Sequence, residues 1–214
     1  MNGEVPLRLD WCSRAAARWA VEHWYYRPVM PAGKILTIGV WEDGEFAGTV
    51  VFGMSVSDAL GRRWGLGTFE CCELARLVLR PGHRCQVSRV VRVALIFLRR
   101  RCPGIRAVVS FADSQLHHGG VYQAGGWIYT GRTAPDRVYT DAAGRVWHSR
   151  EVKESGWCRT FGGKISRCPR PSECTATRVP GKHRYVMAMD EETRRKVALF
   201  AAPLPSRLGD APEA

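Results

Sequence analysis

One segment constrains the fold of this 214-residue chain more than any other. From residue 71 to residue 111 the sequence passes through an apolar run, a polar loop, an amphipathic run, a Pro-Gly pair and a second apolar run. Apolar runs of strand length that alternate with a helical pattern are typical of a sheet covered by helices. The segment therefore predicts a strand over 71–79, a helix over 88–101 and a strand over 105–111, in an α/β (α+β) fold.

The amphipathic run has apolar residues at the spacing i, i+3, i+4 and i+7, which places them on one face of a helix. They are Val87, Val90, Val91, Ala94, Leu95 and Leu98. The following strand is almost wholly apolar, as expected of a strand covered on both faces, and Asp113 follows its carboxyl end. Sheet proteins place chemistry at such strand ends beside a crevice, so Asp113 is a candidate catalytic residue.

The same segment is strongly basic. No acidic residue lies between Glu73 and Asp113, but nine arginines do: Arg76, Arg80, Arg84, Arg89, Arg92, Arg99, Arg100, Arg101 and Arg106. The chain has a formal net charge of +12 and an isoelectric point near 9.8. Such concentrated charge predicts a polyanionic partner, nucleic acid first and an anionic membrane surface second. A basic protein with no such partner is the alternative.

The rest of the chain predicts further elements and a domain organisation. The patterns indicate helices over 11–26 and 119–125, strands over 35–41, 46–52, 127–131 and 138–147, the last with a turn near 141–144, and a loop over 53–67. Asp43-Gly44 joins the first two strands, and this pair favours a tight hairpin turn. We expect a catalytic domain over 1–150, a basic extension over 151–202 packed on it and ending in a strand near 185–187, and a disordered tail over 203–214.

Membrane and metal signals are weak. No stretch approaches the ~20 apolar residues of a membrane-spanning helix, and the start of the chain lacks a secretion signal. We therefore expect a cytoplasmic protein without a membrane partner, whose eight cysteines are reduced thiols. Four residues that could bind zinc, Cys158, Cys168, Cys174 and His183, share one stretch, but their spacing has no C-x-x-C knuckle. We expect no metal site there.

Several short clusters occur together in one order and spacing. They are His23 with PAGK at 31–34, GVWE at 39–42, ELAR at 73–76, VSR at 87–89, VSFAD at 109–113, GVYQAGGW at 120–127 and PGKHRY at 180–185. Each cluster is weak by itself, but together they are specific. With these clusters the chain resembles the Mom family of bacteriophage DNA-modification proteins, over about residues 23–187.

This resemblance implies a fold and an activity. The order helix, hairpin, strand, helix, strand, helix, strand is that of the acyltransferase fold called GNAT, with a mixed central sheet flanked by helices. The family converts the N6 amino group of adenine in DNA to a methylcarbamoyl (carbamoylmethyl) derivative that shields phage DNA from restriction in the bacterial cytoplasm. The residues that the resemblance implies in activity are His23, Arg76, Ser88, Asp113 and Tyr122.

These residue types also suit the chemistry. The exocyclic amine of adenine is a poor nucleophile, so Asp113 or His23 would take its proton. Tyr122 would donate to the leaving group or stack on the base, while Arg76 and Ser88 would bind an anionic part of the donor. Structural roles are the alternatives: an Asp113–Arg76 ion pair, a helix end at His23, an N-cap at Ser88 and a core aromatic at Tyr122. Where the family has a tyrosine directly after the histidine, this chain has Trp24, so Tyr25 or Tyr26 would substitute for it.

The donor and the DNA contacts complete the expectations. GNAT enzymes bind the donor's pyrophosphate on a glycine-rich loop, but residues 84–89 contain no glycine. Acetyl-CoA and an aminoacyl-tRNA are therefore both candidate donors, and a bound iron is conceivable although no spacing supports it. The expected donor contacts are Arg84, Gln86, Ser88 and Arg89. The expected contacts to double-stranded DNA are Tyr25, Arg92, Arg99, Lys164, Arg167, Lys182 and Arg184.

Two other functions remain open from the sequence. One is an N-acetyltransferase acting on a small amine or a protein. The other is a basic nucleic-acid-binding module without catalysis, in which only the arginines matter.

Overall fold

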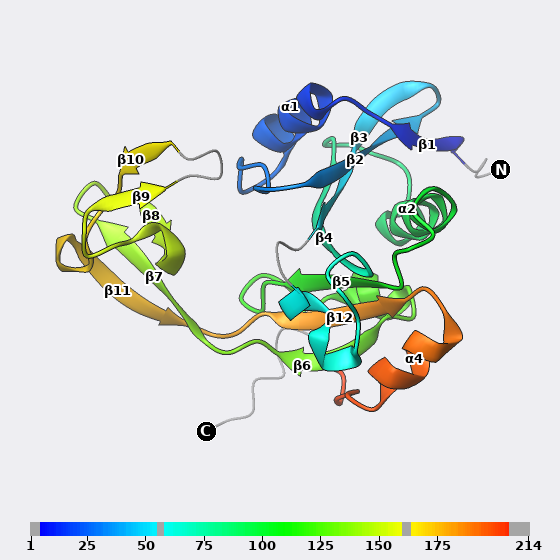
Figure 1. The fold of residues 1–214 in the computed structure, drawn as a ribbon. Coiled ribbons are helices and arrows are strands. Elements are labelled where there is room, and N and C mark those ends of the chain that lie inside the picture. The colour runs from blue at the N-terminus through cyan, green and yellow to red at the C-terminus, as the bar shows by residue number, and fades with distance from the viewer. Residues whose placement is uncertain (1–4, 55–57, 160–163, 206–214) are drawn as a thin grey trace.

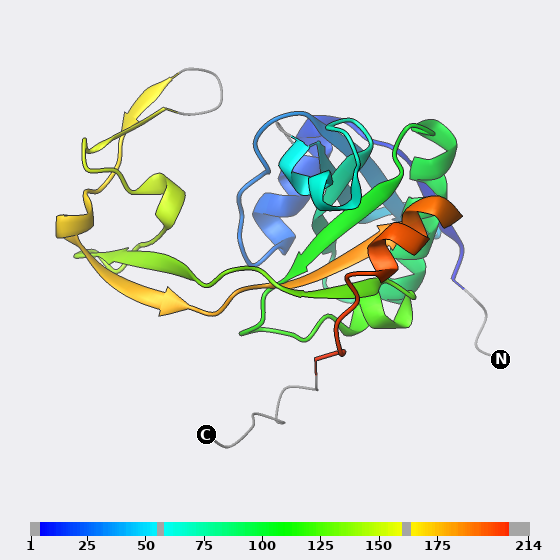
Figure 2. The same cartoon turned by 60° about the horizontal axis from the view of Figure 1, so that its bottom comes forward.

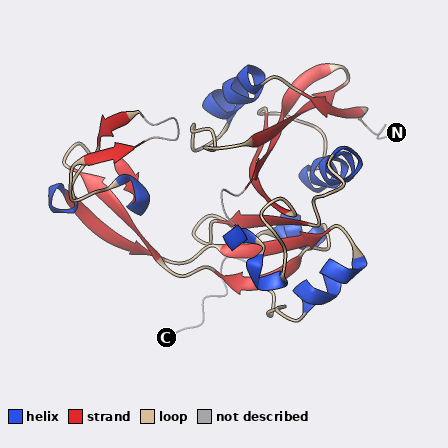
Figure 3. Cartoon of the chain, in the orientation of Figure 1, coloured by secondary structure: helices blue, strands red, loops and turns tan. Residues whose placement is uncertain are grey.

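The structure is a computed structural model that describes residues 5–54, 58–159 and 164–205 (Figures 1 and 2). A large sheet with helices on both faces forms the body, and a smaller set of strands forms an arm that projects from it (Figure 3). No helix among the described residues has the length and apolar character needed to cross a membrane.

The body contains a seven-stranded sheet in the order β1-β2-β3-β4-β5-β12-β6. The strands are β1 (Leu7–Trp11), β2 (Ile35–Glu42), β3 (Glu45–Met54), β4 (Cys71–Leu79), β5 (Ala107–Ala112), β12 (His183–Ala188) and β6 (Ile128–Arg132). Each neighbouring pair is antiparallel except β4 and β5, which run parallel. Parallel strands need a crossover connection, and here it contains the predicted helix.

Helices cover both faces of this sheet. They are α1 (Arg14–Trp24), α2 (Val87–Arg101), α3 (Gly120–Ala124) and α4 (Glu191–Ala198), with short 3-10 turns at Asp58–Leu60 and Arg62–Trp64. The Ser13 hydroxyl accepts a hydrogen bond from the Ala16 amide at 3.0 Å and so caps α1. Asp190 caps α4 in the same way, through the Thr193 amide at 2.8 Å. These caps satisfy backbone groups that a helix cannot satisfy itself.

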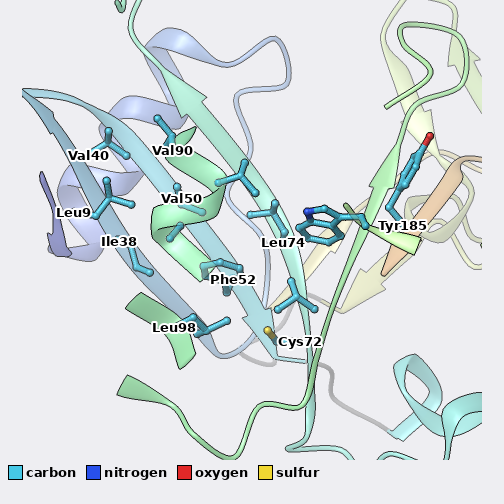
Figure 4. Close-up of a cluster of buried hydrophobic side chains, with 14 of the residues drawn as sticks. Leu9, Ile38, Val40, Val50, Phe52, Cys72, Leu74, Val90, Leu98 and Tyr185 are labelled. Atoms are coloured by element: carbon cyan, nitrogen blue, oxygen red, sulfur yellow. The ribbon is translucent and has the colours of Figure 1, made fainter. Parts of the chain in front are cut away.

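The main hydrophobic core lies between α2 and strands β1 to β4 (Figure 4). The sequence pattern explains it, because Val90, Ala94 and Leu98 of α2 are fully buried against Val50 and Phe52 of β3. On the opposite face, α1 packs on β3 and β4, and α4 packs on β12. The body is therefore a helix–sheet–helix sandwich.

Strands β4 and β5 separate from each other along their length. They pair only from Cys71 to Glu73, opposite Ala107 to Val109. Beyond that point β4 stays with β3, with a register shift that leaves Ala75 unpaired between Leu74 and Arg76. A bulge of this kind bends a strand and increases its twist. The two strands consequently open a fork at their carboxyl ends.

The arm comprises residues 133–182 and leaves the body between β6 and β12. Its strands are β7 (Asp136–Asp141), β8 (Val146–His148), β9 (Trp157–Arg159), β10 (Ile165–Arg167) and β11 (Cys174–Val179), with 3-10 turns at Ser149–Glu151 and Pro171–Glu173. One sheet has the order β11-β7-β8, and β9 and β10 form a separate hairpin. The two connections to the body are tied together, because the Thr133 amide donates to the Lys182 carbonyl at 2.9 Å.

The mixed sheet flanked by helices confirms the predicted fold class. The hairpin turn is also confirmed, since Asp43 and Gly44 have φ values of 49° and 83°, as a tight hairpin turn requires. The helix predicted over 11–26 is too long at its start, because Trp11 ends a strand that pairs with β2. The region predicted as a loop contains two 3-10 turns, and its residues 55–57 lie outside the described residues.

The domain boundary expected at residue 150 falls inside the arm, because β7 pairs with β11 across it. The strand near 185–187 is present as β12, and it pairs with both β5 and β6 in the body sheet. Most of the tail expected to be disordered, residues 206–214, lies outside the described residues.

Candidate active site

A cavity of about 910 Å³ lies at the fork between β4 and β5, and we call it the fork cavity. It collects residues from four parts of the chain: the segment after α1, the two forked strands, the region of α3 and the arm. Its polar lining includes Tyr25, Tyr26, Glu73, Arg76, Asp113, Tyr122, His148, Arg150 and Lys182. Four predicted site residues, Tyr25, Arg76, Asp113 and Tyr122, therefore meet at one cavity, as does the predicted DNA contact Lys182.

Three carboxylates line the fork cavity: Glu73, Asp113 and Asp136. Asp136 already has a partner, because its Oδ2 lies 3.3 Å from His148 Nε2. Glu73 is the last residue of β4 that pairs with β5, and burial raises its pKa above the ordinary value of 4.5. The positive charges of Arg76, Lys182 and Arg150 offset part of that rise. Asp113 follows β5, and its Oδ1 accepts a hydrogen bond from the Gln115 amide at 3.1 Å. Glu73 and Asp113 both have the chemistry of a general base.

Tyr122 extends from α3 into the fork. Its Oη lies 2.8 Å from the Ser110 hydroxyl, which is itself 3.2 Å from the Leu74 carbonyl oxygen. Burial raises the pKa of Tyr122, so the phenol keeps its proton at neutral pH and can donate it. Its ring also stacks on Tyr185 at 5.1 Å, which fixes its orientation.

Arg76 holds the segment after α1 against β4. Its Nε and Nη2 donate to the Val29 carbonyl at 3.2 and 3.0 Å, and its Nη1 donates to the Ala75 carbonyl at 2.7 Å. The guanidinium also lies 5.4 Å from the centre of the Tyr25 ring. Within the described part of the chain no ion pair joins Arg76 to Asp113, so Asp113 is not committed to that partner.

His23 and Ser88 are not brought to the fork cavity. His23 lies exposed in the last turn of α1, with Nδ1 2.8 Å from the Trp19 carbonyl oxygen and its ring stacked on Trp19 at 4.4 Å. Ser88 lies in the first turn of α2, where Gln86 is the N-cap residue. The structure thus places His23 at a helix end and Ser88 beside a second cavity.

The second cavity, of about 720 Å³, lies along α2, and we call it the α2 cavity. Its lining contains the predicted donor contacts Gln86, Ser88 and Arg89 and also Arg92, Arg99, Gly125 and Trp127. Arg84 lies outside it and pairs with Asp43. Arg89 donates to the Val5 carbonyl at 3.0 Å, so it also anchors the N-terminal segment.

Buried Glu42, the last residue of β2, binds the loop before α2 through its carboxylate. The amides of Arg84 and Cys85 donate to its carboxylate at 3.2 and 2.8 Å. Burial alone would raise the pKa of Glu42, but these amides lower it overall. Backbone amides in front of a helix are typical ligands for phosphate, and here a carboxylate of the chain already takes two of them.

One aromatic pair separates the two cavities. Tyr122 lines the fork cavity, Trp127 lines the α2 cavity, and their rings pack edge to face at 5.1 Å. The Trp127 side chain is 4% exposed, yet its Nε1 has no hydrogen-bond partner among the described residues. A buried indole N–H without a partner is costly, which makes this position a candidate for contact with a ligand once neighbouring side chains move.

The predicted DNA contacts lie in different parts of the molecule. Lys182 lines the fork cavity, Arg92 and Arg99 line the α2 cavity, and Lys164 and Arg167 belong to the arm. Arg184 is held against β6, where its Nε and Nη2 donate to Thr130 at 2.8 and 2.9 Å. Burial lowers the pKa of Arg184, which fits a packed position.

No group of three metal-binding side chains occurs in the part of the chain that the structure describes. His183 is buried, with Nδ1 3.0 Å from the Tyr129 hydroxyl. Cys158 donates its thiol hydrogen to the Glu151 carbonyl at 3.2 Å, and Cys174 lies in β11.

Three residues shape the site in ways that the sequence did not predict: Glu73, Glu42 and Trp127, each of which lies in one of the short clusters named above. Glu73 did carry a signal, because it is an acid at a sheet position between buried Cys72 and Leu74. For Glu42 and Trp127 the clusters gave no role, since their roles depend on tertiary contacts.

Comparison with known proteins places the fold and the family. The E. coli ribosomal-protein-S18-alanine N-acetyltransferase superimposes with a TM-score of 0.50 at 9% identity, over 87% of this chain and 96% of that one. The Vibrio cholerae spermidine/spermine N-acetyltransferase SpeG gives a TM-score of 0.46 at 10% identity, over 88% and 96%. The first likeness shows the GNAT-like fold. No curated protein matches the sequence.

A family model matches nearly the whole chain. The model is that of the Mom protein family, and the match extends over residues 6–206. It includes the body, the arm and α4, so the arm is part of the matched region. The chain belongs to the Mom protein family.

Proposed function

We propose that this protein transfers an acyl-type group to the N6 amine of adenine in duplex DNA. The product is the methylcarbamoyl (carbamoylmethyl) derivative, which shields phage DNA from restriction in the cytoplasm of the bacterial host. The observation that carries the proposal is the pair of cavities on either side of the Tyr122–Trp127 contact. The adenine can enter from the fork cavity and the donor from the α2 cavity, so that they meet at the fork.

The fork cavity receives the adenine. The amine attacks the activated carbonyl carbon of the donor, a carbon–nitrogen bond forms, and the bond from that carbon to the leaving group breaks. A glycyl donor gives an N6-glycyl adenine, which has the same atoms as the carbamoylmethyl derivative and needs one rearrangement to become it, whereas an acetyl donor lacks the amide nitrogen and gives only N6-acetyladenine. The leaving group takes the electron pair, and the amine proton passes to a carboxylate. Glu73 is the first choice for this base, because its raised pKa is closer to the working pH than that of an exposed carboxylate. Asp113, which follows β5 on the other side of the fork, is the alternative base.

The α2 cavity receives the donor. Ser88, Arg92 and Arg99 would hold its anionic part, and the Trp127 indole N–H would donate to one of its oxygens. The bound donor supplies the activated carbon and the leaving group. Tyr122 can give the leaving group its proton. Since Glu42 takes two amides before α2, the phosphates would be bound mainly by side chains, and both acetyl-CoA and an aminoacyl-tRNA meet this requirement.

An adenine must leave the double helix to reach the carboxylates. Extrusion costs a few kcal/mol of unstacking, and aromatic side chains at the opening can recover part of it by stacking. Tyr25 and Tyr26 line the cavity, and Tyr26 is 65% exposed. We assign them to the extruded base or its neighbour.

The test is nucleoside mass spectrometry of DNA from cells that express the protein. A modified adenosine is expected in the wild type, and Glu73→Gln should lower its amount by about 10²–10⁴-fold. Glu70→Gln is the matched control, because Glu70 contacts Arg106 outside the fork cavity. Labelled glycine and labelled acetate, fed separately, identify the donor.

Two results would contradict the proposal. Unmodified DNA together with acetylated small amines would favour an N-acetyltransferase. Salt-sensitive DNA binding with no modified nucleoside at any expression level would leave a binding module.

A further inference from the structure

The hairpin of β9 and β10 presents an unusual exposed face. Trp157 pairs with Arg167, and Arg159 pairs with Ile165, so each apolar side chain lies opposite an arginine. Alternate residues of a strand share a face, which places these four side chains together. We call Trp157, Arg159, Ile165 and Arg167 the hairpin face.

All four side chains of the hairpin face are exposed. Trp157 and Ile165 retain 57% and 59% of their accessible surface. Single exposed apolar residues are ordinary, but here they alternate with guanidinium groups. Within the described residues neither Arg159 nor Arg167 has a carboxylate at ion-pairing distance.

The sequence around the hairpin face carries only positive charge. Between Glu154 and Glu173 the sequence contains no acid and four basic residues, Arg159, Lys164, Arg167 and Arg170. A strand face that combines positive charge with flat apolar side chains suits a partner that offers both phosphates and bases.

The base of the hairpin is well anchored. The Cys168 amide donates to the Gly156 carbonyl at 2.9 Å, and the Lys153 amide donates to the Pro169 carbonyl at 3.2 Å. Cys168 and Gly156 are buried. The hairpin face is therefore presented by an ordered element, which lowers the entropy lost on binding.

The arm that carries the hairpin also forms a wall of the fork cavity, through His148, Arg150 and Lys182. In both views the hairpin lies across from the C-terminal end of α1, where Tyr25 and Tyr26 follow (Figures 1 and 2). A ligand that enters the fork cavity from outside thus passes between the arm and the body.

We propose that the hairpin face inserts into a groove of the duplex DNA from which the adenine is extruded. Arg159 and Arg167 contact phosphates, and Trp157 and Ile165 pack against base edges in the major groove. This inference rests on the proposed function for the identity of the duplex. The major groove of B-form DNA admits a two-stranded ribbon, whereas the deep, narrow groove of A-form RNA does not, which favours DNA over a tRNA at this face.

The test measures binding of the full-length protein to a 30-base-pair DNA duplex (about 100 Å long) and to the RNA duplex of the same sequence, over a salt series. Arg159→Gln/Arg167→Gln should reduce the slope of log Kd against log salt by about 2. Trp157→Ala/Ile165→Ala should weaken DNA binding by roughly 10-fold with little change in slope. The charge control is Arg194→Gln/Arg195→Gln on α4, and the apolar control is Leu199→Ala, which is 84% exposed.

The outcomes separate this inference from the proposed function. Hairpin variants that bind and modify DNA like the wild type overturn the inference, while loss of modification in Glu73→Gln still supports the proposed function. Hairpin-dependent DNA binding by a wild type that makes no modified adenosine supports the hairpin site and overturns the proposed function. Equal loss of RNA-duplex binding in the hairpin variants would overturn the choice of DNA.

Discussion

The body and the arm are stabilised in different ways. The body buries three hydrophobic clusters around one sheet. In the described part of the arm only two apolar side chains, Val152 and Cys168, are buried. Its small sheet depends instead on backbone pairing and on turns such as that of Asp141, whose carboxylate accepts hydrogen bonds from Ala143, Arg145 and Trp147. Stability is therefore concentrated in the body, while the arm supplies charge and surface close to the site.

The largest expected effect comes from the core of the body. Phe52→Ala removes a fully buried ring and should lower the free energy of unfolding by about 3–5 kcal/mol. Trp157→Ala in the arm removes a larger but exposed side chain and should change it by less than about 0.5 kcal/mol. Urea unfolding followed by far-ultraviolet circular dichroism measures both. Comparable losses would show that the arm contributes to the global stability.

The next largest expected effect is on activity, and it depends on how the arm is joined to the body. A Cβ at Gly181 would lie 1.8 Å from the Thr133 carbonyl oxygen of the neighbouring connection, so Gly181→Ala must move one connection. Displacement of groups around a reaction centre by about 1 Å can cost on the order of 100-fold in rate. We therefore expect roughly 100-fold less modified adenosine, with a nearly unchanged urea midpoint.

The control for that variant is Gly104→Ala, because an added Cβ there meets no atom within 4 Å. It should leave the amount of modified adenosine unchanged. If Gly181→Ala also retained full activity, the position of the arm would not matter to the reaction.

The sequence predicted the body better than the arm for a physical reason. In α2 the apolar residues repeat at the helical period, and the buried set Val90, Val91, Ala94 and Leu98 follows that pattern. β1 was missed because it is an edge strand with Arg8 and Asp10 pointing outward. The strands of the arm are short and mostly exposed, so burial leaves no periodic pattern in their sequence. The insertion of β12 between β5 and β6 depends on pairing over long sequence distances.

The site was predicted only where a local pattern pointed to it. Asp113 follows an apolar strand, so its place at the fork could be inferred. The exposure of His23, the capture of two amides by Glu42 and the unpaired indole of Trp127 depend on tertiary contacts. Glu73 was visible as an acid among apolar residues, but its burial could not be known before β4 and β5 were seen to separate.

The smallest expected effects are changes of stability with pH, and their direction should be opposite in the body and in the arm. Burial raises the pKa of Glu73 in the body above 4.5, so the folded state binds this proton more tightly than the unfolded state. Its contribution to stability therefore falls as pH rises from about 4.5 through the folded pKa. In the arm, the Trp147 indole and the Arg145 amide lower the pKa of Asp141 below 3.8. That contribution is complete above about pH 3.8 and is lost as pH falls further.

Substitutions of Glu73 and Asp141 measure this difference between the body and the arm. Glu73→Gln should unfold at higher urea than the wild type at pH 7, and the gain should disappear below about pH 4. Asp141→Asn should speed amide hydrogen exchange in β7 and β8 at pH 7 without shifting the urea midpoint, because the turn is local to the arm. The two variants separate the regions, since one changes global unfolding and the other changes only local opening. A shift of the urea midpoint in Asp141→Asn would mean that the arm and the body unfold as one unit.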